Sequence, residues 1–117
     1  MKKVLIIDDD TSILEALKVA VEMQGYQVFT ISNGEEAENK IFDIEPDLIL
    51  LDVLLSGLDG RDIAYKIKNT VETKDIPIIM LSASPQTDRS SRDFGADDFI
   101  AKPFELKELF EILKKYL

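Results

Sequence analysis

Cysteine and histidine are both absent from this chain of 117 residues. Without cysteine there is no disulfide, iron–sulfur cluster, thiolate zinc site or thiol nucleophile. Without histidine there is no imidazole base, no serine–histidine triad and no imidazole metal ligand. Any chemistry must therefore use carboxylates, hydroxyls, lysine or arginine.

Long apolar runs are absent as well. The longest have only the length of a strand, as in 48–51, whereas a helix that crosses a bilayer needs about 20 apolar residues. The short apolar stretch at the N-terminus runs directly into acidic residues and lacks a small-residue cleavage site, so we predict no secretory signal. With 45% apolar residues, five glycines and four prolines, the composition indicates one globular domain that does not enter a membrane.

Positive charge is scarce. The chain has 14 basic and 23 acidic residues, which gives a net charge of −9. Such a surface repels a phosphate backbone, so we expect no direct binding to nucleic acid.

Short apolar runs alternate five times with helical patterns. The expected strands are Val4–Ile7, Tyr26–Ile31, Leu48–Leu51, Ile78–Leu81 and Asp98–Ala101. Nearly continuous apolar strands are typical of a parallel sheet that is covered on both faces. The sequence therefore predicts an α/β domain over 1–117, a flavodoxin-like (βα)5 fold with helices on both faces and strand order 2-1-3-4-5.

Helix signals fill the gaps between these strands. The expected helices run from Asp10–Ser12 to Gly25, from Asn33 to Pro46, from Asp59 or Gly60 onward, after Pro85, and over Phe104–Leu117. We expect Val71 and Leu106 to face inward on the third and fifth of them. The fourth, over 86–93, has no apolar residue, which predicts a poorly anchored, mobile helix; an ordinary loop is the alternative.

Polar residues stand where four of the five expected strands end. Asp8 and Asp9 follow the first strand, Asp52 the third, Ser82 the fourth and Lys102 the fifth. In the predicted strand order these four strands are neighbours, and ligands of such sheets bind outside the carboxyl ends of the strands. This edge is therefore the candidate functional site.

Three carboxylates at one edge repel each other unless a cation is present. With Lys102, the Asp8, Asp9 and Asp52 group carries two net negative charges, and an all-oxygen ligand set suits Mg²⁺ or Mn²⁺. The plainer alternative is helix capping, which we expect to be the main role of Asp10.

The same residues suit phosphoryl transfer. A carboxylate fixed beside a metal, such as Asp52, can attack phosphorus and form an acyl phosphate. Lys102 would neutralise charge on the transferred group, and the Ser82 hydroxyl would donate a hydrogen bond to a phosphoryl oxygen.

Four segments, in order along the chain, carry a specific resemblance. They are VLIIDDD, LILLDVLLSGLDG, IIMLSAS and GADDFIAKPF. Over essentially its whole length the sequence resembles the response regulator receiver domains of bacterial two-component signalling. The resemblance implies a cytoplasmic phospho-accepting signalling domain rather than a conventional enzyme.

The resemblance also assigns roles to individual residues. Asp52 resembles the phosphoacceptor, and Lys102 and Ser82 its catalytic partners. The implied Mg²⁺ ligands are Asp8, Asp9, Asp52 and the backbone carbonyl of Leu54. Ser82 and Phe99 resemble the pair that switches conformation on phosphorylation. The Lys102–Pro103 bond is typically cis in the family.

The implied partners are a sensor histidine kinase or phosphotransfer protein, and a downstream protein or output domain. In the family, the face of the fourth helix, fifth strand and fifth helix serves for homodimers or output. The chain ends where the fifth helix should end, so we expect a stand-alone regulator or a receiver from a longer protein.

Two departures from the family pattern bear on the site. Leu55-Ser56 stands where many members have Met-Pro, and Phe99 stands where many have tyrosine, so a switch would work by packing alone. The apolar Leu54, two residues past Asp52, gives no group to orient an attacking water, which predicts slow self-dephosphorylation.

Three rival functions fit the sequence less well. A metal-dependent aspartyl phosphatase typically has a second aspartate where this chain has Leu54. A flavodoxin-like electron carrier needs a hydroxyl- and glycine-rich loop, where this chain has acids that repel FMN phosphate. A degenerate receiver, acting as a phosphorylation-independent scaffold, would lack one of the acids or the lysine, and none is missing.

Overall fold

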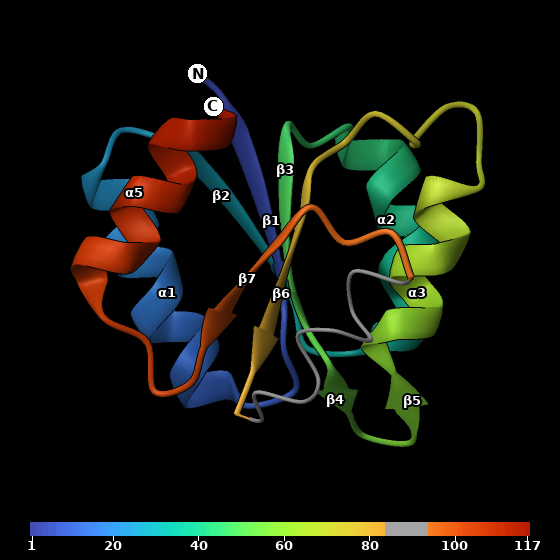
Figure 1. Cartoon of the computed structure of the whole chain (residues 1–117), viewed down its shortest axis with the longest axis horizontal. Helices are drawn as coiled ribbons and strands as arrows, with labels where there is room; N and C mark the ends of the chain where they lie inside the picture. The colour runs from blue at the N-terminus through green and yellow to red at the C-terminus, as the bar shows by residue number, and fades with distance from the viewer. Residues whose placement is uncertain (84–93) are drawn as a thin grey trace.

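A parallel five-stranded sheet forms the centre of the computed structural model, which describes residues 1–83 and 94–117. Its order is β2-β1-β3-β6-β7, with bounds β1 Lys3–Ile7, β2 Gln27–Ile31, β3 Leu48–Asp52, β6 Ile78–Ser82 and β7 Asp98–Ala101. This is the predicted order 2-1-3-4-5, and Figure 1 shows the strands with their carboxyl ends toward the bottom. The predicted fold is confirmed. The expected mobile helix over 86–93 lies outside the described residues.

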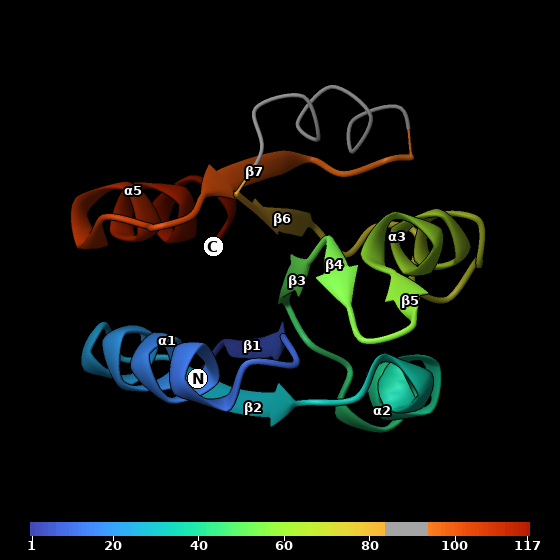
Figure 2. The same cartoon turned by 90° about the horizontal axis from the view of Figure 1, so that it is seen from below.

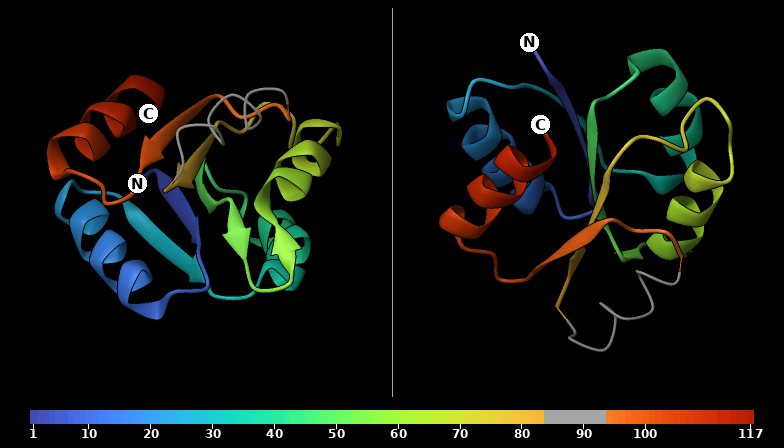
Figure 3. Two further views of the ribbon diagram at one scale, coloured as in Figure 1. Left: turned by 60° about the horizontal axis from the view of Figure 1, so that its bottom comes forward. Right: turned by 45° about the horizontal axis from the view of Figure 1, so that its top comes forward.

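Helices cover both faces of the sheet. They are α1 (Thr11–Met23), the short 3₁₀ turn Gly34–Glu36 with α2 (Ala37–Ile44), α3 (Gly60–Lys68) and α5 (Leu106–Tyr116). Figure 2 shows α1 and α5 on one side of the sheet and α2 and α3 on the other. A small antiparallel hairpin, β4 (Leu54–Leu55) and β5 (Leu58–Asp59), joins β3 to α3 and is drawn in green in the left view of Figure 3.

Side-chain caps begin the helices near the predicted residues. The Asp10 carboxylate accepts hydrogen bonds from the backbone N–H groups of Ser12 and Ile13, at 2.9 and 3.2 Å. Asn33 and Asp59 do the same for the 3₁₀ turn and for α3. These bonds satisfy N–H groups that have no partner inside the helix, and the capping role predicted for Asp10 is confirmed.

The sheet separates two apolar clusters because successive strand residues point to opposite faces. On β1, Val4 and Ile6 pack with the α1 and α5 side, whereas Leu5 and Ile7 pack with the α2 and α3 side, and all four are fully buried. Their burial on both faces explains the continuous apolar runs in the sequence. The core therefore holds the strands rigidly while their carboxyl ends reach the surface.

Two apolar residues were wrongly expected to face inward. Val71 is 78% exposed because α3 ends at Lys68, before the helical spacing could turn this residue toward the sheet. Thr73 is buried in that region, and its hydroxyl donates to the Ile67 carbonyl at 2.7 Å. Leu106 is 52% exposed because it is the first residue of α5, whose buried positions are Leu109 and Leu113.

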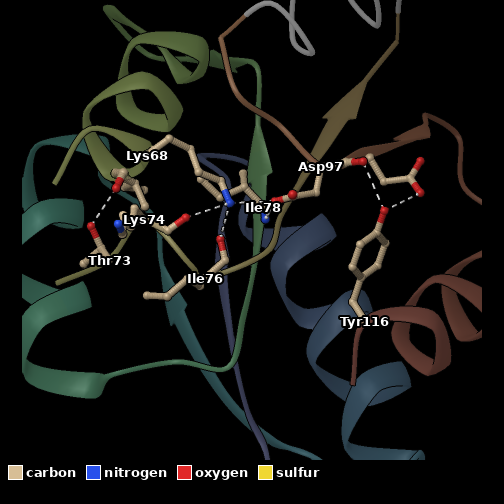
Figure 4. Close-up of polar contacts among 9 residues, drawn as sticks. Lys68, Thr73, Lys74, Ile76, Ile78, Asp97 and Tyr116 are labelled. Carbon is tan, nitrogen blue, oxygen red and sulfur yellow. Dashed lines mark hydrogen bonds and ion pairs between the residues drawn. The ribbon is translucent and has the colours of Figure 1, made fainter. Parts of the chain in front are cut away.

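Paired polar groups close the amino end of β6 and β7 (Figure 4). The Lys68 ammonium group donates to the Ile76 carbonyl at 2.7 Å and pairs with the Asp97 carboxylate at 2.8 Å. The same Asp97 oxygen accepts the Ile78 N–H at 2.8 Å, and the Tyr116 hydroxyl donates to the Asp97 carbonyl at 3.1 Å. Four elements are thereby joined at this end: α3, β6, β7 and α5.

Candidate functional site

A hollow of about 350 Å³ lies at the carboxyl ends of β1, β3, β6 and β7. Its lining includes the ionisable and hydroxyl side chains of Asp8, Asp9, Asp10, Asp52, Arg61, Lys102 and Ser82. Another hollow, of about 330 Å³, lies between α2 and α3, but Glu38 is its sole acidic lining residue among those the structure describes. The first hollow therefore has more charged side chains in its lining than the second.

Strand pairing brings these residues to one edge. Asp52 ends β3 opposite Leu81, and Ser82 ends β6 opposite Ala101. The N–H of Lys102 donates to the Ser82 carbonyl at 2.7 Å, which extends the pairing one residue beyond β7. The residues thus meet because the parallel strands are in register and end together.

Asp8 is fixed from two sides. It is fully buried, one carboxylate oxygen accepts the Asp10 N–H at 2.9 Å, and the other accepts the Lys102 ammonium at 2.8 Å. Lys102 also lies 3.2 Å from a carboxylate oxygen of Asp52. One partly buried ammonium group therefore serves two buried carboxylates, and it cannot neutralise both.

The ionisation of Asp52 reflects this imbalance. Burial, and then the neighbouring charge of Asp8, raise the pKa of Asp52 to about 6, although Lys102 and the backbone N–H of Leu54 act in the opposite direction. Burial alone would lower the pKa of Lys102, but its hydrogen bond to Asp8 and the charges of both carboxylates raise it. At neutral pH the site therefore holds an ionised lysine and excess negative charge.

The three aspartates also fit a divalent cation. One oxygen from each of Asp8, Asp9 and Asp52 lies within 4.8 Å of the oxygens from the other two. Carboxylate oxygens at this separation, without nitrogen or sulfur donors, suit a hard cation such as Mg²⁺, which keeps several waters. A bound divalent cation would also offset the surplus negative charge.

The other predicted site residues are arranged as follows. Ser82 is buried at the hollow, whereas Phe99 is half-buried and packs against the core cluster on the α2 and α3 side. The Leu54 side chain is 75% exposed at the rim. The Lys102–Pro103 peptide bond is cis, as the resemblance implied.

Two residues at the site were not identified from the sequence. The Ser56 hydroxyl donates to a carboxylate oxygen of Asp9 at 2.6 Å. Arg61 lines the hollow, pairs with Asp59 and lies 5.9 Å from the centre of the Phe94 ring. Ser56 could have been found from the sequence, because it stands where many family members have proline. Nothing in the pattern of α3 indicated that Arg61 would line the hollow.

The chain matches a known family over nearly its whole length. The family model for the response regulator receiver domain matches residues 4–114. The phosphate regulon transcriptional regulatory protein PhoB of Pseudomonas aeruginosa is 44% identical over 118 residues, which cover 99% of this chain and 52% of PhoB. The DNA-binding dual master transcriptional regulator RpaA of Synechocystis is 34% identical over 119 residues, covering 100% of this chain and 49% of RpaA. The chain thus spans about half the length of these relatives.

Solved structures give the same result. A response regulator from Chloroflexus aurantiacus superposes with a TM-score of 0.94 at 35% identity, covering 98% of this chain and 96% of that one. The chemotaxis protein CheY4 of Vibrio cholerae superposes with a TM-score of 0.92 at 30% identity, covering 100% and 99%. The chain therefore belongs to the response regulator receiver domain family. Receiver domains typically bind Mg²⁺, and the acidic cluster here could hold such an ion.

Across the described part of the chain, every helix is too short or too polar to cross a membrane.

Proposed function

We propose that residues 1–117 form a receiver domain that accepts a phosphoryl group on Asp52, in a reaction that depends on Mg²⁺ or, alternatively, Mn²⁺. The observation that carries this proposal is the position of Asp52: its buried carboxylate lines the hollow, 3.2 Å from Lys102 and within reach of two further acids. A nucleophile, a cation partner and a metal-ligand set thus meet at one point.

The proposed reaction is a transfer from a phosphohistidine of a sensor histidine kinase or phosphotransfer protein. This chain has no histidine, so it cannot be the donor. A carboxylate oxygen of Asp52 bonds to phosphorus while the bond between phosphorus and the donor imidazole breaks, and the imidazole leaves with the electron pair. Because the pKa of Asp52 is about 6, the attacking carboxylate is mostly ionised at neutral pH even before the cation binds.

The chain's own residues stabilise the transferred group. Asp8, Asp9, Asp52 and the Leu54 carbonyl would hold Mg²⁺, which supplies positive charge to the phosphoryl oxygens when bound. Lys102 adds a second positive charge, and the Ser82 hydroxyl donates a hydrogen bond to a phosphoryl oxygen. These contacts would stabilise the negative charge of the phosphoryl oxygens during the transfer.

The same contacts would drive a change of conformation. Once Ser82 and Lys102 bind the phosphoryl group, the end of β6 shifts and Phe99, which is only half-buried, turns further inward. The exposed surface near β7 and α5 then changes shape. That surface would contact a downstream protein or output domain, or a second copy of this chain.

The wider setting of the protein follows from this function. We propose a cytoplasmic signalling protein, since its donor would be a cytoplasmic kinase. The net charge of −9 argues against contact between this domain and nucleic acid, so any control of transcription would pass through another domain or protein. It is a phospho-accepting switch that assists its own phosphorylation and dephosphorylation, not an enzyme with a free substrate.

Intact mass tests the proposal directly. Wild type, Asp52→Asn and the exposed control Asp75→Asn are incubated with acetyl phosphate, with and without Mg²⁺. We expect one added phosphoryl group on wild type and Asp75→Asn, only with Mg²⁺, and none on Asp52→Asn. Addition to Asp52→Asn would identify another acceptor, and no addition to a wild type that binds Mg²⁺ would indicate the phosphorylation-independent scaffold.

A further inference from the structure

The three aspartates of the acidic cluster are held very differently. Asp8 is fully buried, and both of its carboxylate oxygens already accept hydrogen bonds from this chain. Asp52 is buried beside Lys102. Asp9 is exposed to solvent, and the bond that holds its carboxylate comes from Ser56, at 2.6 Å. The orientation of Asp9 therefore depends on a residue 47 positions away along the chain.

Ser56 is itself placed by a tight hairpin. Leu55 pairs with Leu58, so Ser56 and Gly57 form the turn, and Gly57 has a positive φ of 74°, which glycine adopts without steric cost. The pairing continues at the base of the hairpin, directly after β3, because the Gly60 N–H donates to the Val53 carbonyl at 2.7 Å. The backbone of the turn thus fixes the position from which the Ser56 hydroxyl reaches Asp9.

Close packing at the base of this hairpin restricts its backbone further. A side chain at Gly60 would bring its first carbon to 2.0 Å from the Asp52 carbonyl oxygen, so only glycine fits this approach. Asp59, the last residue of β5, caps α3. The hairpin between β3 and α3 therefore has little freedom to move relative to Asp52.

The bond from Ser56 leaves Asp9 able to bind a cation. A carboxylate accepts about four hydrogen bonds or metal contacts on its two oxygens, and the hydroxyl uses one of them. Groups that hydrogen-bond to a ligating carboxylate fix its orientation, and their removal typically weakens metal binding about 10–100-fold. The same bond joins Asp9 to the hairpin that carries Leu54, so it sets the separation between two proposed ligands.

We propose that Ser56 is a positioning residue for the divalent cation: its hydroxyl fixes the Asp9 carboxylate and ties it to the β4–β5 hairpin. This inference rests on the proposed Mg²⁺ site and assigns a role to the residue that replaces the proline common in the family. A proline side chain has no hydroxyl to donate, so this chain orients Asp9 by a contact that such members cannot make.

The experiment measures Mg²⁺ affinity by calorimetry, without any phosphodonor. The variants are Ser56→Ala, which removes the hydroxyl, Ser56→Thr, which keeps it, and Ser32→Ala, which removes an exposed hydroxyl elsewhere. We expect Ser56→Ala to weaken Mg²⁺ binding about tenfold, and Ser56→Thr and Ser32→Ala to stay within about twofold of wild type. Circular dichroism checks that each variant is folded.

A second readout separates positioning from a merely structural role. Phosphorylation by acetyl phosphate is followed as a function of Mg²⁺ concentration. For Ser56→Ala we expect the half-saturating Mg²⁺ concentration to rise about tenfold while the rate at saturating Mg²⁺ stays near that of wild type. Loss of the hairpin's structure would instead lower the saturating rate, and that result would overturn the positioning role.

The remaining outcomes are distinct. If Ser56→Ala binds Mg²⁺ as well as wild type does, and wild type is phosphorylated on Asp52, the role of Ser56 is wrong and the proposed function stands. Tighter binding by Ser56→Ala would also overturn the proposal, because the hydroxyl would then compete with the cation. If wild type binds no divalent cation, both the inference and the proposed site fail.

Discussion

The two ends of the central sheet differ in how their charged side chains are paired. At the amino end, Lys68 and Asp97 pair at 2.8 Å, and each also bonds to backbone groups of neighbouring elements. At the carboxyl end, Asp8, Asp9 and Asp52 lie together, and the Lys102 ammonium group pairs with Asp8 and Asp52. The first arrangement is balanced within the protein, whereas the second has an excess of negative charge.

The pKa values of one aspartate at each end express this difference. Burial, followed by repulsion from Asp8, raises the pKa of Asp52 to about 6. Burial also acts on Asp98 in the same direction, but hydrogen bonds from the Phe99 N–H, the Tyr116 hydroxyl and Lys115 outweigh it and lower the pKa of Asp98. The charges of the amino end are thus matched within the protein, whereas the carboxyl end gives up stability where we propose that a cation and a phosphoryl group bind.

The largest effect is expected from removing Lys102, the lysine that pairs with both Asp8 and Asp52 at the carboxyl end. Lys102→Met should lower the rate of phosphorylation by acetyl phosphate about 100-fold, since a charge-stabilising group in a site of this kind contributes about that much. Lys115→Met, which removes a lysine that pairs with Asp98 at the other end, should leave the rate unchanged. Intact mass followed over time measures the phosphorylation rate of both variants. An equal loss of rate in the two would show that the carboxyl end has no special role in phosphorylation.

Breaking the balanced end should cost stability but not phosphorylation. Lys68→Met leaves Asp97 and the Ile76 carbonyl without this partner, and we expect a loss of about 2 kcal/mol in the free energy of unfolding. Lys66→Met, on the same helix, removes an exposed pair with Glu38 at 3.4 Å and should cost less than about 0.5 kcal/mol. Urea unfolding measures the free energy of unfolding of both variants. Equal losses would show that the Lys68–Asp97 pair contributes no more than an exposed surface pair.

Neutralising the crowded end should instead increase stability. Because the pKa of Asp52 is about 6 in the folded protein and 3.8 ordinarily, the folded state holds this proton more tightly. The stability of wild type therefore falls as pH rises from about 4 to 6, and Asp52→Asn avoids that fall. At pH 7.5 without divalent cations we expect Asp52→Asn to be more stable by about 1–2 kcal/mol, with no difference near pH 3.5.

Urea unfolding at several pH values follows this effect, and Asp75→Asn is the exposed control. Asp98 has the opposite effect on the pH dependence of stability. Because its pKa is lowered in the folded protein, its ionised form stabilises the fold above pH 4, and this stabilisation is lost as the pH falls below that value. A stability that rises steadily with pH through 6 in wild type, but not in Asp52→Asn, would contradict the assignment of the raised pKa.

The smallest effect concerns the lifetime of the phosphorylated form. The exposed, apolar Leu54 at the rim provides no hydrogen bond to an attacking water, so self-dephosphorylation should be slow. Leu54→Asn offers an amide at this point and should speed the decay several-fold, an effect of about 1 kcal/mol on the barrier. The decay is followed by intact mass after the phosphodonor is removed; unchanged or slower decay in Leu54→Asn would rule out this role.

The sheet and its order were predictable because buried parallel strands leave continuous apolar runs. Such runs at 4–7, 48–51 and 78–81 indicate both the strands and their central positions. The polar residues at the strand ends then predicted which edge to inspect. Helix ends were harder to predict: Val71 continues the apolar spacing of α3, but the helix ends at Lys68.

Contacts between distant segments were beyond the sequence pattern. The Lys68–Asp97 pair and the Ser56–Asp9 bond each join residues that have no periodic relation. Their formation depends on how a hairpin turns and on where a helix ends. In the acidic cluster, by contrast, each residue stands at or directly after the end of a strand, so the grouping of the three aspartates could be inferred from the strand order, although the bond that orients Asp9 could not.

The most direct test of the central claim locates the phosphoryl group by its chemistry. Wild type is phosphorylated with acetyl phosphate and Mg²⁺, reduced with borohydride, which converts an aspartyl phosphate to homoserine, and mapped by peptide mass spectrometry. We predict homoserine at position 52 and unchanged aspartate at positions 8, 9, 97 and 98. Homoserine at any of those four positions instead of 52, or a stable phosphoryl group on a serine, would contradict the assignment of Asp52 as the acceptor.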